Sequence, residues 1–277
     1  MAGNLSSIKQ RIRSIQSTRK TTKAMEVVAN AKLAKAKKEA GKSEDYTNAL
    51  IELSNIVLSG LEEDCVYTQA NNTLPKANVV ITSDMGLCGG YNANIVKLVE
   101  KSINQDDSIY VIGSHERTHI AQFNDHILNE TIKSDNLEYE DINTVAKELL
   151  SLYINQKIGG IRVFYTKFIN TLTFEPTCVT LLPLEKKEVQ QSKVIFDFEP
   201  SGYEIAMQLI PMMVTSNLWE YVKESKLSEF AARRAAMESA NKNAQDMIED
   251  LTLKYNQARQ SAITTQISEI VAGANAT

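Results

Sequence analysis

Apolar residues recur at helical spacing near both ends of the chain. At the N-terminal end, apolar and small residues three or four positions apart are Leu5, Ile8, Ile12, Ile15, Thr18, Thr22, Met25, Ala29, Leu33 and Ala36. At the C-terminal end, a similar series is Leu218, Val222, Phe230, Met237, Ala240, Ala244, Met247, Leu251, Tyr255, Ala258, Ile263, Ile267 and Ile270. Because this spacing places side chains on one face of an α-helix, the pattern predicts two amphipathic terminal helices.

Both terminal segments lack helix-breaking residues. Residues 4–40 and 212–272 contain neither glycine nor proline, whereas all five prolines lie within residues 75–211. As one helix, residues 212–272 would be about 90 Å long at about 1.5 Å per residue, which is too long to bury in a globule of this size. We therefore expect the terminal helices to pair with each other as an antiparallel coiled coil.

Between these helices the hydrophobic pattern changes to that of short buried strands. The expected strands are Ala77–Thr82, Ser108–Ile112, Ile161–Phe168 and Thr177–Leu182, and the expected intervening helices are Tyr91–Ser102 and Thr144–Asn155. Strands that alternate with helices predict a mainly parallel sheet with covered faces. The predicted fold is α/β: a long antiparallel coiled coil of N- and C-terminal helices with an inserted Rossmann-like α/β domain. We place the N-terminal shaft helix at residues 1–60, the central domain at 61–205 and the C-terminal shaft helix at 206–277.

Charge is distributed unevenly along the chain. The 277 residues include 30 Lys and Arg and 34 Asp and Glu, for a net charge of −4. Residues 1–38, however, hold ten basic residues and a single acid, Glu26, so a basic arm precedes an acidic body. This asymmetry predicts an anionic partner for the arm. Because the arm has no aromatic residue on which bases could stack, we expect acidic protein surfaces rather than nucleic acid.

Cysteine content and hydropathy narrow the class of protein further. Three scattered cysteines, Cys65, Cys88 and Cys178, are too few for a disulfide framework or a cysteine-rich zinc site, and they fit a reducing compartment. No run of about 18 apolar residues is present, so we expect no membrane span. The N-terminus lacks the apolar core of a secretory signal, so we interpret it as part of the mature protein.

Two local motifs suggest chemistry. His115, Glu116 and His119 match H-E-x-x-H, which on a helix places two imidazoles one turn apart beside a general base. The third histidine of one common zinc pattern is missing, because Asp125 stands in its place, and Gly113 just before the motif predicts only a short helix. The second motif, residues 83–92 (SDMGLCGGYN), follows a strand and precedes a helix, where phosphate loops lie, but it matches neither G-x-G-x-x-G nor a Walker loop. Its glycines are also explained by a tight turn.

Three segments together resemble the gamma subunit of the F-type ATP synthase. The first runs from Ile8 through Arg11, Ile15 and Met25 to Ala29, and the second is the glycine-rich segment 83–92. The third is the C-terminal series Ala231, Ala232, Arg233, Ala236, Met237, Ala240, Asn243, Ala244, Tyr255, Asn256, Arg259, Gln260, Ile263, Thr264, Glu269, Ile270, Val271, Gly273 and Ala274. Because the three occur in the family's order at both ends and in the centre, the resemblance covers essentially the whole chain.

This resemblance implies a rotor rather than an enzyme. In that family the paired terminal helices form the central stalk inside the hexamer of alpha and beta subunits, and the α/β domain lies at its foot with the epsilon subunit and the c-subunit ring. Rotation couples proton translocation through the ring to ATP synthesis or hydrolysis. The subunit itself performs no catalysis and needs no cofactor or metal, and it touches the membrane only through the ring, on the cytoplasmic face of the bacterial plasma membrane. The alternative is a zinc-dependent hydrolase that uses His115, Glu116 and His119.

The resemblance also assigns roles to particular residues. Contact with the beta subunits and coupling are expected at Met25, Arg233, Arg259, Gln260, Thr264 and Glu269. Contact with the c ring is expected at Phe198 and Glu199. The chain departs from the family pattern at Gln266, where a glutamate is usual, so one carboxylate contact is lost there.

Overall fold

The computed structural model describes residues 2–41, 44–61, 65–185 and 198–274. Contacts between residues divide the chain into two compact units. The first comprises residues 1–30 and 233–277, and the second comprises residues 31–232. In the described ranges, every helix is either too short or too polar to cross a lipid bilayer.

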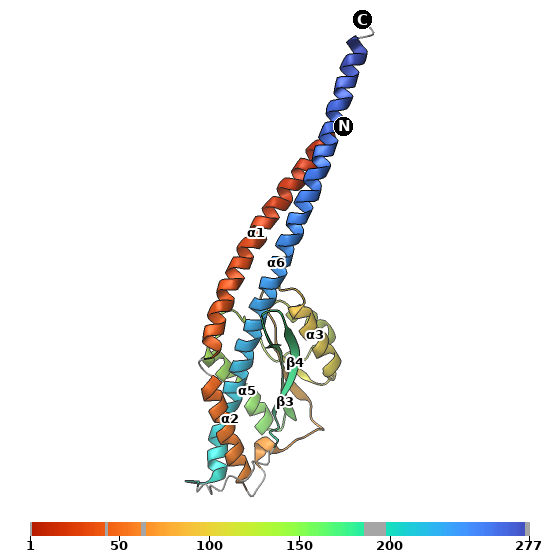
Figure 1. Ribbon diagram of the computed structural model, residues 1–277. Helices are drawn as coiled ribbons and strands as arrows, with labels where there is room; N and C mark the ends of the chain where they lie inside the picture. The colour runs from red at the N-terminus through yellow and green to blue at the C-terminus, as the bar shows by residue number, and fades with distance from the viewer. Residues whose placement is uncertain (1, 42–43, 62–64, 186–197, 275–277) are drawn as a thin grey trace. The chain divides into compact units, whose positions relative to one another are not determined.

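The first unit is a pair of antiparallel helices. It consists of the N-terminal part of α1 (Ala2–Ala40) and the C-terminal part of α6 (Gly202–Ala274), which lie side by side in Figure 1. Arg19 hydrogen-bonds to Gln245, whereas Thr22, which comes later on α1, bonds to Asn241, which comes earlier on α6. This order of contacts shows that the helices run in opposite directions, and it confirms the predicted antiparallel pair.

The buried stripe of this pair differs in phase from the prediction on part of α6. From Ala244 the less exposed positions advance by four and three residues through Ile248, Leu251, Tyr255, Ala258, Ala262 and Thr265. Four positions that we expected on the stripe, Met247, Ile263, Ile267 and Ile270, are 57%, 46%, 56% and 71% exposed. The reason is that alternating steps of four and three residues keep a helix face toward its partner, and these positions fall outside that series.

The second unit is built on a four-stranded sheet with the order β2-β1-β3-β4. Its strands are β1 (Lys76–Ile81), β2 (Ser108–Ile112), β3 (Gly160–Phe168) and β4 (Phe174–Leu182). β1 pairs in parallel with β2 and β3, and β4 pairs antiparallel with β3. Residues 169–173 between β3 and β4 are too few for a crossover helix, so β4 returns as the second strand of a hairpin. The mainly parallel sheet is thus confirmed, with one antiparallel edge strand.

Helices cover both faces of this sheet (Figure 1). An apolar core lies on each face. One face packs against α2 (Glu44–Ser59), α5 (Tyr139–Ile154) and the early part of α6, and the other packs against α3 (Tyr91–Ser102) and α4 (Arg117–Phe123). A short 3-10 turn, η1 (Val66–Thr68), precedes β1. Within β1, Val79 and Ile81 enter the first core and Val80 enters the second, because successive strand residues point to opposite faces.

The prediction of a single N-terminal shaft helix over residues 1–60 is wrong. α1 ends at Ala40 and α2 begins at Glu44. Gly41 follows α1 directly, and glycine is among the weakest helix formers. Glu44 and Asp45 place negative charge in the first turn of α2, where the helix dipole favours it. The division of the chain into the segments 1–60, 61–205 and 206–277 otherwise stays a prediction.

Two other helices begin earlier than the hydrophobic pattern predicts. α6 begins at Gly202, where the Ser201 hydroxyl accepts a hydrogen bond from the Glu204 backbone N–H at 3.2 Å. The helix then continues through Pro211, although proline cannot donate the usual backbone bond. Ile210, the residue before Pro211, is buried. Its packing in the core compensates for the backbone hydrogen bond that Pro211 cannot donate, so the helix continues. α5 likewise begins at Tyr139 instead of Thr144, behind a capping box formed by Glu138 and Asp141.

Candidate functional site

All six predicted coupling residues lie in the first unit. Met25 on α1 and Arg233 on α6 are both half-buried. The other four are exposed along the C-terminal part of α6: Arg259, Gln260, Thr264 and Glu269. Thr264 turns its hydroxyl back to the Gln260 carbonyl at 3.0 Å, so its side chain follows the helix surface. The structure therefore places these residues on two helices at two levels of the unit, with no enclosed site among them.

A polar cluster of Thr22, Glu26 and Asn241 joins the two helices next to Met25. The Thr22 hydroxyl donates to the Asn241 side-chain oxygen at 2.8 Å, and the Asn241 amide donates to a Glu26 carboxylate oxygen at 2.6 Å. Lys23 donates to the other Glu26 oxygen at 2.7 Å. The bond from Lys23, aided by that from Asn241, holds the pKa of the Glu26 carboxyl below its usual value in spite of partial burial. Asn241 escaped the sequence analysis because only apolar positions were traced along the stripe.

A basic groove runs along the same helix pair. It has a volume of about 1060 Å³, and its walls carry the cations Arg19, Lys20, Lys23 and Lys242. Val27 and Val28 also line it and are 59% and 56% exposed. None of the described residues that line the groove is acidic, so it combines positive charge with apolar surface. Such a surface suits an acidic partner segment that also carries apolar side chains.

In the second unit, α6 is fastened to the end of β3 by hydrogen bonds. The Ser225 hydroxyl accepts from the Thr166 backbone N–H at 3.2 Å, and the Ser228 hydroxyl donates to the Thr166 carbonyl at 2.9 Å. Ser225 also pairs with the Tyr91 hydroxyl at 2.8 Å. Both serines are fully buried, so these bonds form away from water and hold α6 firmly against the sheet.

The glycine-rich segment 83–92 is a turn whose polar groups are already paired. The Asp84 carboxylate accepts from the backbone N–H groups of Ser114 at 3.0 Å and Asp135 at 2.8 Å. The Ser83 N–H donates to the Asn92 side chain at 3.1 Å. A carboxylate at the centre of this turn repels phosphate, so the geometry favours the structural interpretation of the segment over a phosphate loop.

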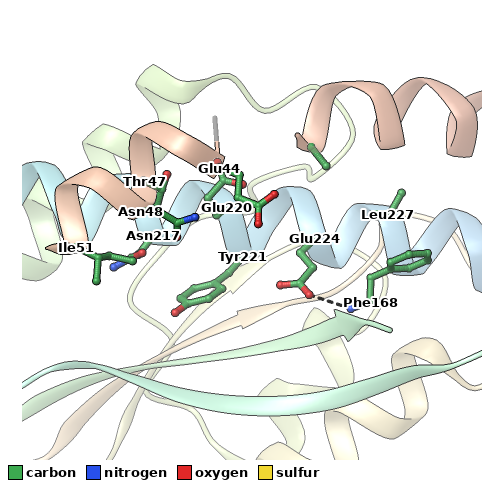
Figure 2. A pocket seen from close by; sticks show the side chains of 11 residues that line it. Glu44, Thr47, Asn48, Ile51, Phe168, Asn217, Glu220, Tyr221, Glu224 and Leu227 are labelled. Atoms are coloured by element: carbon green, nitrogen blue, oxygen red, sulfur yellow. Dashed lines mark hydrogen bonds between the residues drawn. The ribbon is translucent and has the colours of Figure 1, made fainter. Parts of the chain in front are cut away.

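A pocket of about 350 Å³ lies where α2 begins against α6 (Figure 2). Its lining includes three carboxylates, Glu44, Glu220 and Glu224, beside the aromatic rings of Phe168 and Tyr221. Figure 2 shows Glu224 accepting the backbone N–H of Phe168, a bond of 3.1 Å. Burial raises the pKa of the Glu224 carboxyl, while this bond partly opposes the rise. In the described part of the chain, no group of three or more His, Cys, Asp or Glu side chains is placed to hold a metal ion.

The H-E-x-x-H match does not form the helical pair that zinc requires. α4 begins at Arg117, so His115 precedes the helix that carries His119. Glu116 pairs with both imidazoles, at 2.7 Å to His115 and 3.3 Å to His119. Both histidines are exposed, and the carboxylate that would serve as the base is occupied by them. We therefore reject the alternative of a zinc-dependent hydrolase.

The two residues predicted to contact the c ring lie just before α6. Phe198 is partly buried against the first core, and its ring lies so close to Gly60 that a Cβ there would approach within 2.9 Å. Glu199 is exposed beside it. Phe198 therefore helps to anchor the segment before α6, whereas the exposed side chain of Glu199 can contact another molecule.

Comparison with known proteins covers the whole chain. The family model described as ATP synthase matches residues 4–277. Proteins named ATP synthase gamma chain from Mycoplasma mycoides and Lachnoclostridium phytofermentans are each 37% identical to this chain. The alignment covers 99% of this chain and 99% of the Mycoplasma protein, and 97% of both chains for the Lachnoclostridium protein.

Solved structures share the fold. A chain of the Euglena gracilis mitochondrial ATP synthase, described as OSCP/F1/c-ring in rotational state 3, superposes with a TM-score of 0.75 at 15% identity. That match covers 100% of this chain and 95% of the other. A chain of the Tetrahymena thermophila mitochondrial ATP synthase, from a structure of the central stalk and c ring, gives 0.62 at 19% identity and covers 79% and 99%.

Proposed function

The chain belongs to the ATP synthase gamma-chain family, and we propose that it is the rotor of the central stalk. In this role it turns inside a hexamer of alpha and beta subunits and couples proton translocation through the c ring to ATP synthesis or hydrolysis. The subunit itself performs no catalysis. Its contacts with the beta subunits differ from one orientation of the rotor to the next. A rotor can change the nucleotide affinity of a catalytic site only if each orientation stabilises a different conformation of that site.

The observation that carries this proposal is the exposed apolar surface at the end of α6. Ile267, Ile270 and Val271 are 56%, 71% and 53% exposed. Among the described residues of the first unit, the buried apolar side chains are only Ala29, Met237 and Ala244. A helix pair with so small a core and so much uncovered apolar surface needs a surrounding partner, and a hexamer that encloses the stalk supplies one.

We assign the contact with the beta subunits to both levels of this unit. Met25 lies on α1 and Arg233 on α6, the two helices that form the basic groove, and the groove offers charge complementary to acidic loops of the beta subunits. Arg259, Gln260, Thr264 and Glu269 face outward on α6 and meet the upper part of the hexamer. Salt screens such contacts, so attachment through the groove weakens as ionic strength rises.

The second unit contributes the foot of the rotor. Glu199, exposed on the segment that Phe198 anchors, contacts the c ring, and the epsilon subunit packs on the same unit. The chain then reaches the membrane only through the ring, on the cytoplasmic face of the bacterial plasma membrane.

Reconstitution tests the proposed function. The chain is mixed with its cognate alpha and beta subunits, and the mixture is separated by size exclusion and assayed for ATP hydrolysis. We expect a complex of three alpha, three beta and one copy of this chain with ATPase activity, and negligible activity from the chain alone. A chain that elutes separately from the hexamer would refute the rotor assignment.

A further inference from the structure

The apolar seam of the first unit is too uniform to define how the two helices align. Among its described residues, the buried members are two alanines, Ala29 and Ala244, and one methionine, Met237. Around these alanines, small side chains pack almost equally well if one helix slides along the other. Apolar packing at this level of the helix pair therefore favours one register only weakly, as in coiled coils with uniform seams.

The polar cluster removes this ambiguity. Both ends of the Asn241 amide are bound by α1, the oxygen by Thr22 at 2.8 Å and the nitrogen by Glu26 at 2.6 Å. Thr22 and Glu26 are four residues apart, so one amide spans one helical turn of the facing helix. A slip by one heptad replaces this pair either with Ile15 and Arg19 or with Ala29 and Leu33. In the second case apolar side chains face the amide, so its donor and acceptor lose both of their partners on α1.

We propose that Thr22, Glu26 and Asn241 are positioning residues that fix the register of α1 against α6. By doing so they fix where Met25, next to Glu26, lies relative to Arg233. The role of Met25 and Arg233 in coupling rests on the proposed function. The register of the two helices concerns the chain alone and is tested independently of that function.

The register is measured as a distance between spin labels on the full chain. Cysteines are introduced at the exposed positions Arg13 and Gln257, and Cys178 is replaced by serine, while Cys65 and Cys88 are buried and escape labelling. We expect a single narrow distance distribution in this background. Asn241→Leu should add a second population at a different distance, because a slip by seven residues moves the two helices past each other by about 10 Å along their axes.

Matched variants separate register from stability. Asn243→Leu makes the same chemical change at an exposed position of the same helix and should keep the distribution narrow. Glu26→Gln retains an oxygen that accepts from Asn241 and should also stay narrow, whereas Glu26→Leu should broaden it. Thr22→Val, which removes one bond with little change of shape, provides the test if Asn241→Leu does not fold. A lower melting temperature with an unchanged distance in Asn241→Leu would overturn the proposal.

The link to coupling is tested in the complex with alpha and beta subunits and the membrane sector. Asn241→Leu should pump fewer protons per ATP hydrolysed than Asn243→Leu. A broadened distance distribution with unchanged coupling would overturn the role in coupling and leave the register assignment intact. A complex that fails to form with the parent chain would instead refute the proposed function.

Discussion

At the scale of single residues, the structure distinguishes side chains that meet a partner from those that hold the fold. Met25 is half-buried on α1 beside the polar cluster, and Glu224 lies in a pocket of the second unit. We expect Met25 to act through contact with the hexamer and Glu224 to affect only the stability of the chain. A substitution of Met25 is therefore measured by coupling, and a substitution of Glu224 by unfolding.

Met25→Lys should leave the chain folded but impair coupling. The added cation lies on the same helix as Arg19, Lys20 and Lys23, so it strengthens attachment to acidic loops in some orientations of the rotor and slows their release. We expect ATP hydrolysis to continue with a several-fold lower yield of pumped protons. Met25→Leu, which keeps size and charge, is the control and should couple normally. Equal coupling in the two variants would show that Met25 does not lie at the contact.

Glu224→Gln should stabilise the chain near neutral pH. Burial raises the folded-state pKa of Glu224 above its unfolded value, so folding favours the protonated form. The stability linked to this group is therefore present below the unfolded pKa and is lost as the pH rises through the folded pKa. Glutamine keeps an acceptor for the Phe168 N–H without the charge. Urea unfolding at several pH values should show a higher midpoint at pH 7 and a weaker fall with pH than in the parent.

The control for this change is Glu175→Gln, at an exposed position on β4. It should leave both the midpoint and its pH dependence unchanged. A Glu224→Gln variant that is less stable than the parent at pH 7 would mean that the negative charge of Glu224 stabilises the fold.

At the scale of elements, side-chain caps mark where α5 and α6 begin, and the hydrophobic pattern does not reveal them. The spacing of apolar residues predicted α3 and β2 at their observed bounds, because a buried face fixes both. It missed the first turn of α6, because the predicted C-terminal helix began at residue 206 and the Ser201 cap was overlooked. The signal was present, since Ser201 followed by Glu204 matches the S-x-x-E start of many helices.

Ser201→Ala should destabilise the second unit by about 1 kcal/mol, because the Glu204 N–H loses its side-chain acceptor. Ser201→Asp keeps an acceptor at the same position and should lose little. The free energy of unfolding in urea measures both variants. No difference between alanine and serine at this position would show that the start of α6 is held by packing alone.

The candidate site was harder to predict than the fold. Resemblance to a family named Met25 and Arg233, whose roles stay predictions, but spacing alone indicated no function for either. Asn241 went unnoticed because a polar residue on an apolar stripe is read as an interruption until its partners are seen. Thr22 and Glu26 are distant in sequence from Asn241, and only the folded helix pair brings them together.

At the scale of the whole molecule, the two units differ in how they are stabilised. The second unit has apolar cores on both faces of its sheet, whereas the described part of the first buries only a few small side chains. The second should therefore be stable by itself, and the first should gain order when partners enclose it.

Hydrogen exchange checks this difference. In the isolated chain, amides of residues 5–25 and 245–270 should exchange at least 10-fold faster than those of β1 and β3, because few buried contacts oppose local opening. Assembly with alpha and beta subunits should slow exchange in both helical segments and leave the sheet unchanged. Equal protection of these segments before and after assembly would contradict an enclosed stalk.

The central claim is that this chain rotates, and observing rotation tests it most directly. Cys178 is exposed whereas Cys65 and Cys88 are buried, so a gold particle can be attached at Cys178 of the complex with immobilised alpha and beta subunits. Because burial of its surroundings raises the pKa of the Cys178 thiol, coupling is done at mildly alkaline pH. The account predicts continuous rotation in one direction, in three steps per turn, when ATP is added. A particle that stays fixed or only fluctuates while the same complexes hydrolyse ATP would contradict it.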